Sequence, residues 1–251
     1  MADPHGLINF HKPTGITSAK ALYAVRKVVG QRKSGHAGTL DPGADGVLVL
    51  CLGRATKLTE QLMDQPKVYR TRLRLNVTSE SFDSDRPLIK VPVPSPPTGA
   101  RLREVISSFE GDLQQVPPAV SAIKIDGRPA YKLERLGKKV ELKPRLVKIY
   151  WLHLHNYTWP ELDLEVACSR GTYVRALARD LGEALGTGGC LTALTRQAVG
   201  PFVLSEAATM EDLQAASSPE DYLIPLDRAR ELLARRPIRI PERPENRGPQ
   251  Q

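Results

Sequence analysis

A glycine-rich turn that leads directly into an apolar run constrains this chain more than any other stretch. Residues 35–42 read GHAGTLDP, and residues 46–50 read GVLVL. Glycine permits positive φ and lets another backbone approach closely. Pro42 fixes its own φ and pushes the preceding residue, Asp41, toward an extended conformation. The backbone of a turn beside a buried strand or helix therefore aims the Asp41 carboxylate, which is how site residues are held.

A simpler interpretation is that Asp41 closes an Asx turn before the proline, as most aspartates in loops do. Taken alone, the turn favours this simpler interpretation. The other motifs of the chain must decide whether the carboxylate has a chemical role.

The composition is that of an ordinary globular protein with an excess of positive charge. The 251 residues are enough for one large domain or two small ones, and 41% are hydrophobic and 25% charged. A net charge of +8 and a pI near 9.5 favour a polyanionic partner. The sequence shows no signal-peptide stretch and no apolar run long enough to cross a bilayer, so we expect a cytoplasmic protein without membrane contact.

Cysteine usage and short motifs argue against a bound metal ion or cofactor. The three cysteines are isolated and include no C-x-x-C pair, which disfavours a zinc site and a disulfide framework. Reduced thiols are expected in the cytosol. The sequence contains no P-loop, no GxGxxG after a predicted strand and no HExxH. We therefore expect no cofactor and no metal.

The hydrophobic pattern predicts an α+β fold with a mixed, largely antiparallel sheet flanked by helices. Strands outnumber those of a strict βαβ alternation. Strands are expected at residues 7–10, 69–77, 122–125, 147–156 and 162–168, and helices at residues 56–63, 102–109 and 173–185. Thr17 or Ser18 should cap a further helix, whose apolar face carries Ala21, Leu22, Val25, Val28 and Val29. The last two strands should form an antiparallel pair, and Gly186 should end the last helix.

Four motifs resemble, in the same order and at similar spacings, those of bacterial tRNA pseudouridine(55) synthases, the TruB-type family. They lie at residues 9–18, 35–50, 67–70 and 168–175, within a resemblance that covers about residues 6–215. One GHxGxLDP motif is moderately specific, whereas four motifs in order are strong evidence. The resemblance implies the pseudouridine synthase fold and conversion of the T-loop uridine of tRNA, position 55, to pseudouridine. That reaction needs no cofactor, because the uracil is only detached, turned and reattached through carbon.

The resemblance assigns the catalytic chemistry to Asp41, Tyr69 and Arg175. Asp41 is the implied nucleophile. Burial raises the pKa of a carboxyl group, and the Arg175 guanidinium would keep Asp41 ionised. Tyr69 would stack on the target base, and the ordinary phenol pKa of about 10 disfavours a role as a base. Without the motifs, Arg175 would be interpreted as an ordinary ion-pair residue and Tyr69 as a core residue of a strand.

The resemblance also implies substrate contacts. Tyr173 would line the uracil pocket, and Leu194 would contact the base. The target uridine must be flipped out of folded RNA, and His36 would stack into the space that it leaves rather than titrate. Lys12 and Pro13 would buttress the pocket. The implied partner is the tRNA T-arm, and we expect a monomer.

Four places depart from the family pattern. Residues 76–83 match its acidic Thr-Asp-Thr-x-Asp segment only in part. Val120 stands where an aromatic residue is common, Asp45 where threonine is usual, and Thr195 in place of the first of two arginines.

The C-terminal part also differs, because too few residues follow Leu233 for the RNA-binding (PUA) module of many bacterial members. We expect a catalytic domain at residues 1–233, with a proline-rich surface excursion near residues 87–98. Residues 234–251 should be a basic, proline-rich, disordered tail. The T-arm would then supply most recognition, with phosphate contacts from a basic helix face: Lys20, Arg26, Lys27, Arg32 and Lys33.

Two other functions were weighed. A catalytically silent tRNA-binding or remodelling protein of the same fold would need none of Asp41, Tyr69 and Arg175, yet all three are present. A hydrolase with a carboxylate pair would need a second acid at matched spacing, and none is evident.

Overall fold

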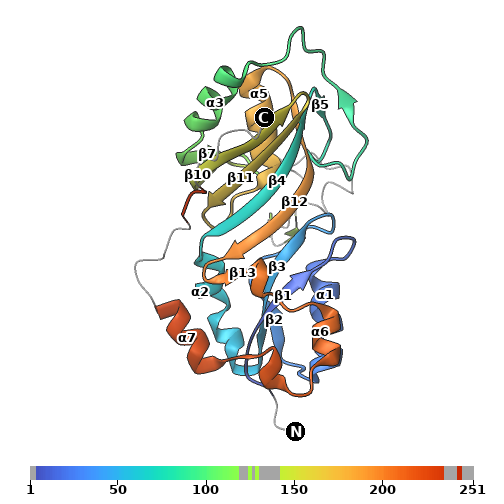
Figure 1. Cartoon of the computed structure of the whole chain (residues 1–251), viewed down its shortest axis with the longest axis vertical. Helices are drawn as coiled ribbons and strands as arrows, with labels where there is room; N and C mark the ends of the chain where they lie inside the picture. The colour runs from blue at the N-terminus through green and yellow to red at the C-terminus, as the bar shows by residue number, and fades with distance from the viewer. Residues whose placement is uncertain (1–3, 119–123, 126–127, 130–141, 235–241, 245–251) are drawn as a thin grey trace. The chain divides into compact units, whose positions relative to one another are not determined.

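The computed structural model describes residues 4–118, 124–125, 128–129, 142–234 and 242–244, with the helices and strands labelled in Figure 1. The chain divides into two compact units. Unit 1 contains residues 1–70 and 194–242, and unit 2 contains residues 71–193 and 243–251. Two strands, β4 (Lys67–Leu75) and β12 (Gly189–Val199), contribute residues to both units.

The sheet of unit 1 is built on β1 (Gly6–Lys12) and β3 (Asp45–Leu52), which are antiparallel. Strand β3 also pairs in parallel with β12 through Asp45 and Gly46. Three short strands complete the sheet: β2 (Ser34–His36) beside β3, β14 (Ile224–Pro225) beside β1 and β13 (Phe202–Val203) beside β12.

The apolar run that follows the turn is a strand buried on both faces. Successive residues of a strand point to opposite faces, so β3 supplies two separate cores. Val47, Val49 and Cys51 belong to one core, and Leu48, Leu50 and Leu52 belong to the other. The requirement for apolar residues on both faces explains why the run lacks the alternation of a half-exposed strand.

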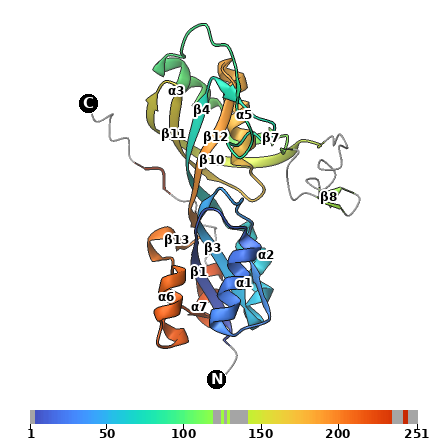
Figure 2. The same cartoon turned by 90° about the vertical axis from the view of Figure 1, so that its right-hand side faces the viewer.

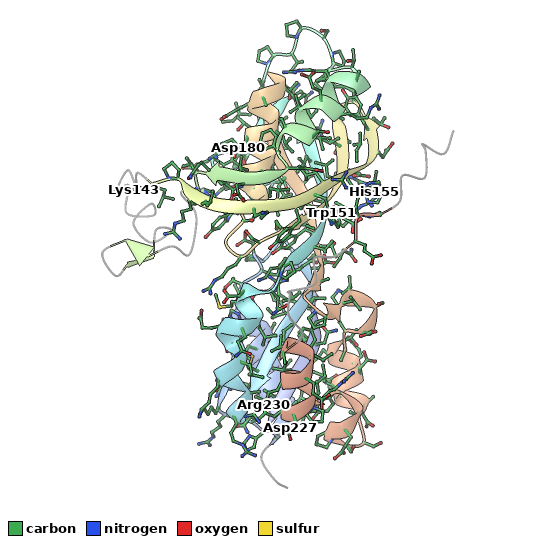
Figure 3. The ribbon with its side chains drawn as sticks, turned by 90° about the vertical axis from the view of Figure 1, so that its left-hand side faces the viewer. Lys143, Trp151, His155, Asp180, Asp227 and Arg230 are labelled. Atoms are coloured by element: carbon green, nitrogen blue, oxygen red, sulfur yellow. The ribbon has the colours of Figure 1, made fainter. Side chains whose placement is uncertain are left out.

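Helices cover both of these cores, as Figure 2 shows around β1 and β3. The first core packs against η1 (Gly53–Leu58), α2 (Thr59–Asp64) and α7 (Leu226–Ala234), and the second packs against α1 (Ser18–Val29) and α6 (Met210–Ala215). Helix α7 is amphipathic: it buries Ala229 and turns the ion pair of Arg230 Nη1 with Asp227 Oδ1, 3.1 Å, to solvent (Figure 3).

Helix α1 begins at one of its two predicted caps and ends at a glycine. The Thr17 side chain accepts a hydrogen bond from the Lys20 backbone N–H, which caps the first turn. Gly30 ends the helix in the left-handed conformation at φ 70°. Two short 3₁₀ turns, η2 (Leu204–Glu206) and η3 (Pro219–Asp221), lie later in unit 1.

The helix expected at residues 56–63 is only partly correct. The chain leaves β3 through the 3₁₀ turn η1, and the α-helix begins at Thr59. Gly53 has φ 55°, and a Cβ atom there would lie 1.9 Å from His5 Nδ1. Only glycine fits here, and the 3₁₀ turn begins at this residue, directly after β3.

Unit 2 is built on an antiparallel run of β11 (Glu161–Cys168), β10 (Arg145–Thr158) and β7 (Gly111–Gln115), next to β4. The predicted pairing of the two central strands is confirmed, with Leu152 opposite Val166. Strand β10 is longer than expected. Two register shifts let it stay paired with β11 from Ile149 to Thr158.

Two helices of unit 2, α3 (Gly99–Ser108) and α5 (Val174–Leu185), lie side by side (Figure 1). Gly186 ends α5 in the left-handed conformation at φ 69°, as predicted. Gly182 lets the helix pack onto the next segment, because a Cβ atom there would lie 2.2 Å from the Gly188 carbonyl carbon. The predicted α+β class with a largely antiparallel sheet is confirmed.

Shorter elements complete unit 2. Strand β5 (Val77–Thr78) pairs with β6 (Ile89–Lys90), which lies in the proline-rich segment and is exposed. Strand β8 (Lys124–Ile125) pairs with β9 (Arg128–Pro129). Val120, part of the strand expected at 122–125 and most of the tail expected at 234–251 lie outside the described residues. Within the described ranges, no helix has the length and apolar character needed to cross a membrane.

Candidate active site

Residues 38–45 of unit 1 form a turn whose backbone is held by side chains from other elements. The Ser18 hydroxyl at the start of α1 accepts a hydrogen bond from Leu40 N at 2.9 Å and donates one to Leu40 O at 3.0 Å. Gly15 N donates to Pro42 O at 2.8 Å, and Ala44 N donates to Asp41 O at 3.1 Å. The segment before α1 and the first turn of α1 therefore fix both sides of Asp41.

Lys12 holds the far side of the same turn from the end of β1. Its side chain is fully buried, and Nζ donates to Ala44 O and to Pro13 O, both at 2.7 Å. Burial lowers the pKa of Lys12, Asp45 and Asp41 raise it, and the charge of Arg196 lowers it. The predicted buttress is thus a buried ammonium that binds carbonyl groups, while Pro13 is exposed.

Arg196 on β12 is a third support, which sequence reasoning missed. Its side chain is only 1% exposed. Nε donates to Val47 O at 2.7 Å, and Nη2 donates to Gly38 O at 3.0 Å. One guanidinium therefore joins the two ends of the turn.

Gly46 shows why the motif needs a glycine after the turn. Its φ is 104°, and a Cβ atom would lie 2.3 Å from Arg196 O and 2.6 Å from Arg196 N. The parallel pairing of β3 with β12 brings these backbones together. Any larger residue would separate the turn from the strand that carries Arg196.

Asp41 is half-buried on this supported turn, and His36 is half-buried at the end of β2. Burial, reinforced by the charge of Arg196, lowers the pKa of His36. Its Nδ1 atom is buried and makes no hydrogen bond within the described part of the chain. The lowered pKa favours the neutral imidazole near pH 7.

Tyr69 and Leu194 lie on neighbouring strands, β4 and β12, and both are half-buried. Two residues before Tyr69, the buried ammonium of Lys67 donates to Gln65 O at 2.6 Å and to Met63 O. This lysine ties the end of α2 to the start of β4, since cations bind the free carbonyl groups of helix C-termini.

The remaining candidates, Tyr173 and Arg175, lie at the start of α5 in unit 2. Arg175 is 6% exposed, and its Nη1 donates to Ser81 O at 3.3 Å. The buried Gln115 side chain bonds the backbone of Tyr173 twice: Oε1 accepts from Tyr173 N at 2.8 Å, and Nε2 donates to Tyr173 O at 3.1 Å. These bonds fix the start of α5 where no side-chain cap is present.

Of the predicted residues, the structure thus gathers Lys12, Pro13 and Asp41 at one turn, with His36 just before it. Tyr69 and Leu194 share neighbouring strands of unit 1, and Tyr173 and Arg175 share one helix start of unit 2. Within the described residues, no cluster of three or more His, Cys, Asp or Glu side chains could hold a metal ion.

Comparison with known proteins decides the family. Residues 26–174 match the TruB family pseudouridylate synthase (N terminal domain), and residues 175–230 match the tRNA pseudouridylate synthase B C-terminal domain. The chain belongs to the TruB family of pseudouridylate synthases. The family resemblance seen in the motifs is thereby confirmed.

Individual relatives of this TruB-family chain agree over most of its length. It is 42% identical to the tRNA pseudouridine synthase B of Alkaliphilus oremlandii over 224 residues, which cover 89% of this chain and 74% of the relative. It is 41% identical to the tRNA pseudouridine synthase B of Bordetella avium, covering 88% of this chain and 92% of the relative.

A solved structure shares the fold. The crystal structure of a Cbf5-Nop10-Gar1 complex contains a chain with a TM-score of 0.71 and 26% identity to this TruB-family chain. The match covers 91% of this chain and 62% of that one.

Two further supports of the TruB-family site, Ser18 and Gln115, were also missed as functional residues. Ser18 was predicted only as a possible helix cap, and the adjacent Thr17 takes that role. Gln115 lies at the end of β7, 58 residues before the backbone that it binds. Neither the serine nor the glutamine carries a local signal for its contact.

Proposed function

We propose that this chain converts the T-loop uridine of tRNA, position 55, to pseudouridine, with Asp41 as the nucleophile. Formation of pseudouridine in tRNA follows from the family and from the names of relatives that match most of the chain. The observation that supports the role of Asp41 is the turn itself, which presents a half-buried carboxylate on a backbone held from three other elements.

The reaction is an isomerisation. The bond between uracil N1 and ribose C1′ breaks, and a bond between uracil C5 and C1′ forms. The proton on C5 is released, and N1 takes up a proton, so the formula is unchanged and nothing is oxidised or reduced. A carboxylate nucleophile held in a fixed geometry divides such a reaction into easier steps.

The other residues have roles that their positions support. Arg175 is buried and would keep the nucleophile ionised. Tyr69 would stack on the flipped base, with Tyr173 lining the uracil pocket and Leu194 in contact with the base. The neutral, half-buried imidazole of His36 suits stacking in the RNA better than proton transfer.

Recognition of the T-arm would rest on phosphate contacts by the basic face that begins on α1. Lys20, Lys27, Arg32 and Lys33 are exposed. The Lys27 ammonium lies 4.8 Å from the centre of the exposed Tyr23 ring, so an aromatic surface accompanies the charge. We also propose that the protein acts as a cytoplasmic monomer.

A tritium-release assay tests the function. In a tRNA transcript labelled with tritium at uridine C5, each turnover frees one label, and carbodiimide mapping locates the product. Wild type should release label from the T-loop uridine, whereas Asp41→Asn should keep its fold and its RNA affinity and release none, because an amide is not a nucleophile.

Two results would overturn the proposal. Turnover by Asp41→Asn within a few-fold of wild type would exclude Asp41 as the nucleophile. Wild type that binds tRNA without releasing label would favour the silent binding protein instead.

A further inference from the structure

The turn that carries Asp41 depends on one charged side chain that lies far from it in sequence. Arg196 comes from β12, yet its guanidinium bonds Gly38 O and Val47 O, 158 and 149 residues away. These two carbonyl groups flank the turn on its N-terminal and C-terminal sides.

We propose that Arg196 is a positioning residue for the nucleophile: by joining Gly38 O to Val47 O, it fixes the backbone from which the Asp41 carboxylate projects. This inference rests on the proposed role of Asp41. Arg196 is assigned no contact with RNA.

The chemistry of the guanidinium fits this task. Its planar, forked donors can bind two acceptors at a fixed separation, which a lysine ammonium on a flexible stem does less well. Gly38 has φ 88° and Gly46 has φ 104°, so both flanks contain backbone that is free of side-chain restraint. Arg196 supplies the restraint that the glycines lack.

The burial of Arg196 also argues for a specific role. A charged side chain that is 1% exposed is unfavourable unless it is well bonded. Packing alone would be served by an aliphatic residue such as those that β12 places in the core at Ala198 and Val199. The buried charge acts on its neighbours as well, because it lowers the pKa of both Lys12 and His36.

The decisive variants are Arg196→Lys and Arg196→Gln, which keep N–H donors but lack the planar fork that holds Gly38 O and Val47 O at a fixed separation. The control is Val199→Ala, which weakens the core beside the same strand but removes no side-chain hydrogen bond. For each variant we would measure the single-turnover rate at saturating tritium-labelled tRNA, the Kd for the same tRNA, the melting temperature, and amide exchange at Leu40 and Ala44.

A positioning role predicts a split between rate and binding. Arg196→Lys should lower the single-turnover rate about 10- to 100-fold, since a displacement of about 1 Å can have that effect. The Kd should stay within about threefold of wild type, because affinity for RNA comes mostly from phosphate contacts. The Leu40 amide donates to Ser18 Oγ and the Ala44 amide donates to Asp41 O. Both amides should exchange faster than in Val199→Ala at an equal loss of melting temperature.

Two results would overturn the inference. In one, the single-turnover rate of Arg196→Lys lies within threefold of that of Val199→Ala. In the other, the rate and the RNA affinity of Arg196→Lys fall together, in step with its melting temperature. If Arg196→Lys does not fold, the same criteria apply to Arg196→Gln, and unfolding of both variants would assign Arg196 to the fold alone. If wild type forms no pseudouridine, the proposed function fails, and amide exchange alone decides whether Arg196 holds the turn. Unchanged exchange would then refute the positioning role.

Discussion

Replacing Ser18 with alanine should destabilise unit 1 by about 2–4 kcal/mol, because two buried backbone groups lose their partner. The Ser18 hydroxyl binds both the N–H and the C=O of Leu40, at 2.9 and 3.0 Å, and the side chain is 1% exposed. A buried group left without a partner costs about 1–3 kcal/mol, and taking about 1–2 kcal/mol for each of the two groups gives the total. Helix α1 should not suffer, since Thr17 caps it and alanine is a good helix former.

The assay is urea unfolding followed by circular dichroism. With a slope of about 2 kcal/mol per M, the loss corresponds to a midpoint about 1–2 M lower. Ser107→Ala is the matched control, because the Ser107 hydroxyl also bonds a backbone carbonyl, Arg103 O at 2.9 Å, but at an exposed position. That change should stay within about 0.5 kcal/mol of wild type. If Ser18→Ala matched Ser107→Ala, the argument that side chains hold the turn through buried bonds would be wrong.

Three further predictions concern charge. Arg175→Lys should lower the rate of pseudouridine formation at least about tenfold, because lysine lacks the planar fork of arginine; equal rates would exclude the proposed pairing with the nucleophile. The pKa of His36 is lower in the folded state than its ordinary value of 6.5, so its contribution to stability is present above that value and is lost as pH falls through the lowered pKa. The urea midpoint should therefore decrease from pH 7 to pH 5, and by a smaller amount in His36→Gln. Reversing the charges of Arg32 and Lys33 should weaken binding of a T-arm hairpin and of whole tRNA alike and flatten the salt dependence, whose slope is about −0.9 per neutralised phosphate; an unchanged slope would assign both residues to a solvated face.

Local signals in the sequence predicted the parts of the fold that local physics determines. Thr17 caps α1 because a hydroxyl can accept from a free N–H of the first turn, and Gly186 ends α5 because glycine can adopt positive φ. The start of α2 was misplaced because hydrophobic spacing over so few residues does not separate the 3₁₀ turn η1 from the first turn of an α-helix.

In the candidate site, too, the residues with a local sequence signal were predicted and those without one were missed. The motifs identified Asp41 and Arg175, whose chemistry shows in the sequence once the family is known. Arg196 and Gln115 could not be found in this way, because each acts on backbone groups more than fifty residues away. Their partners are carbonyl and N–H groups, which every residue carries, so no sequence pattern marks them.

The distance between Arg196 and its turn has a consequence for the order in which the protein is made. The ribosome releases Asp41 early, and Ser18 and Lys12 are already present to bind Leu40 and Ala44. The hydrogen bonds from Arg196 to Gly38 O and Val47 O can form only after more than 140 further residues have been made, including all of unit 2 up to Ala193. A nascent chain that ends before residue 196 therefore carries Asp41, the proposed nucleophile, on an unfinished turn, and this carboxylate reaches its final geometry only when synthesis is nearly complete.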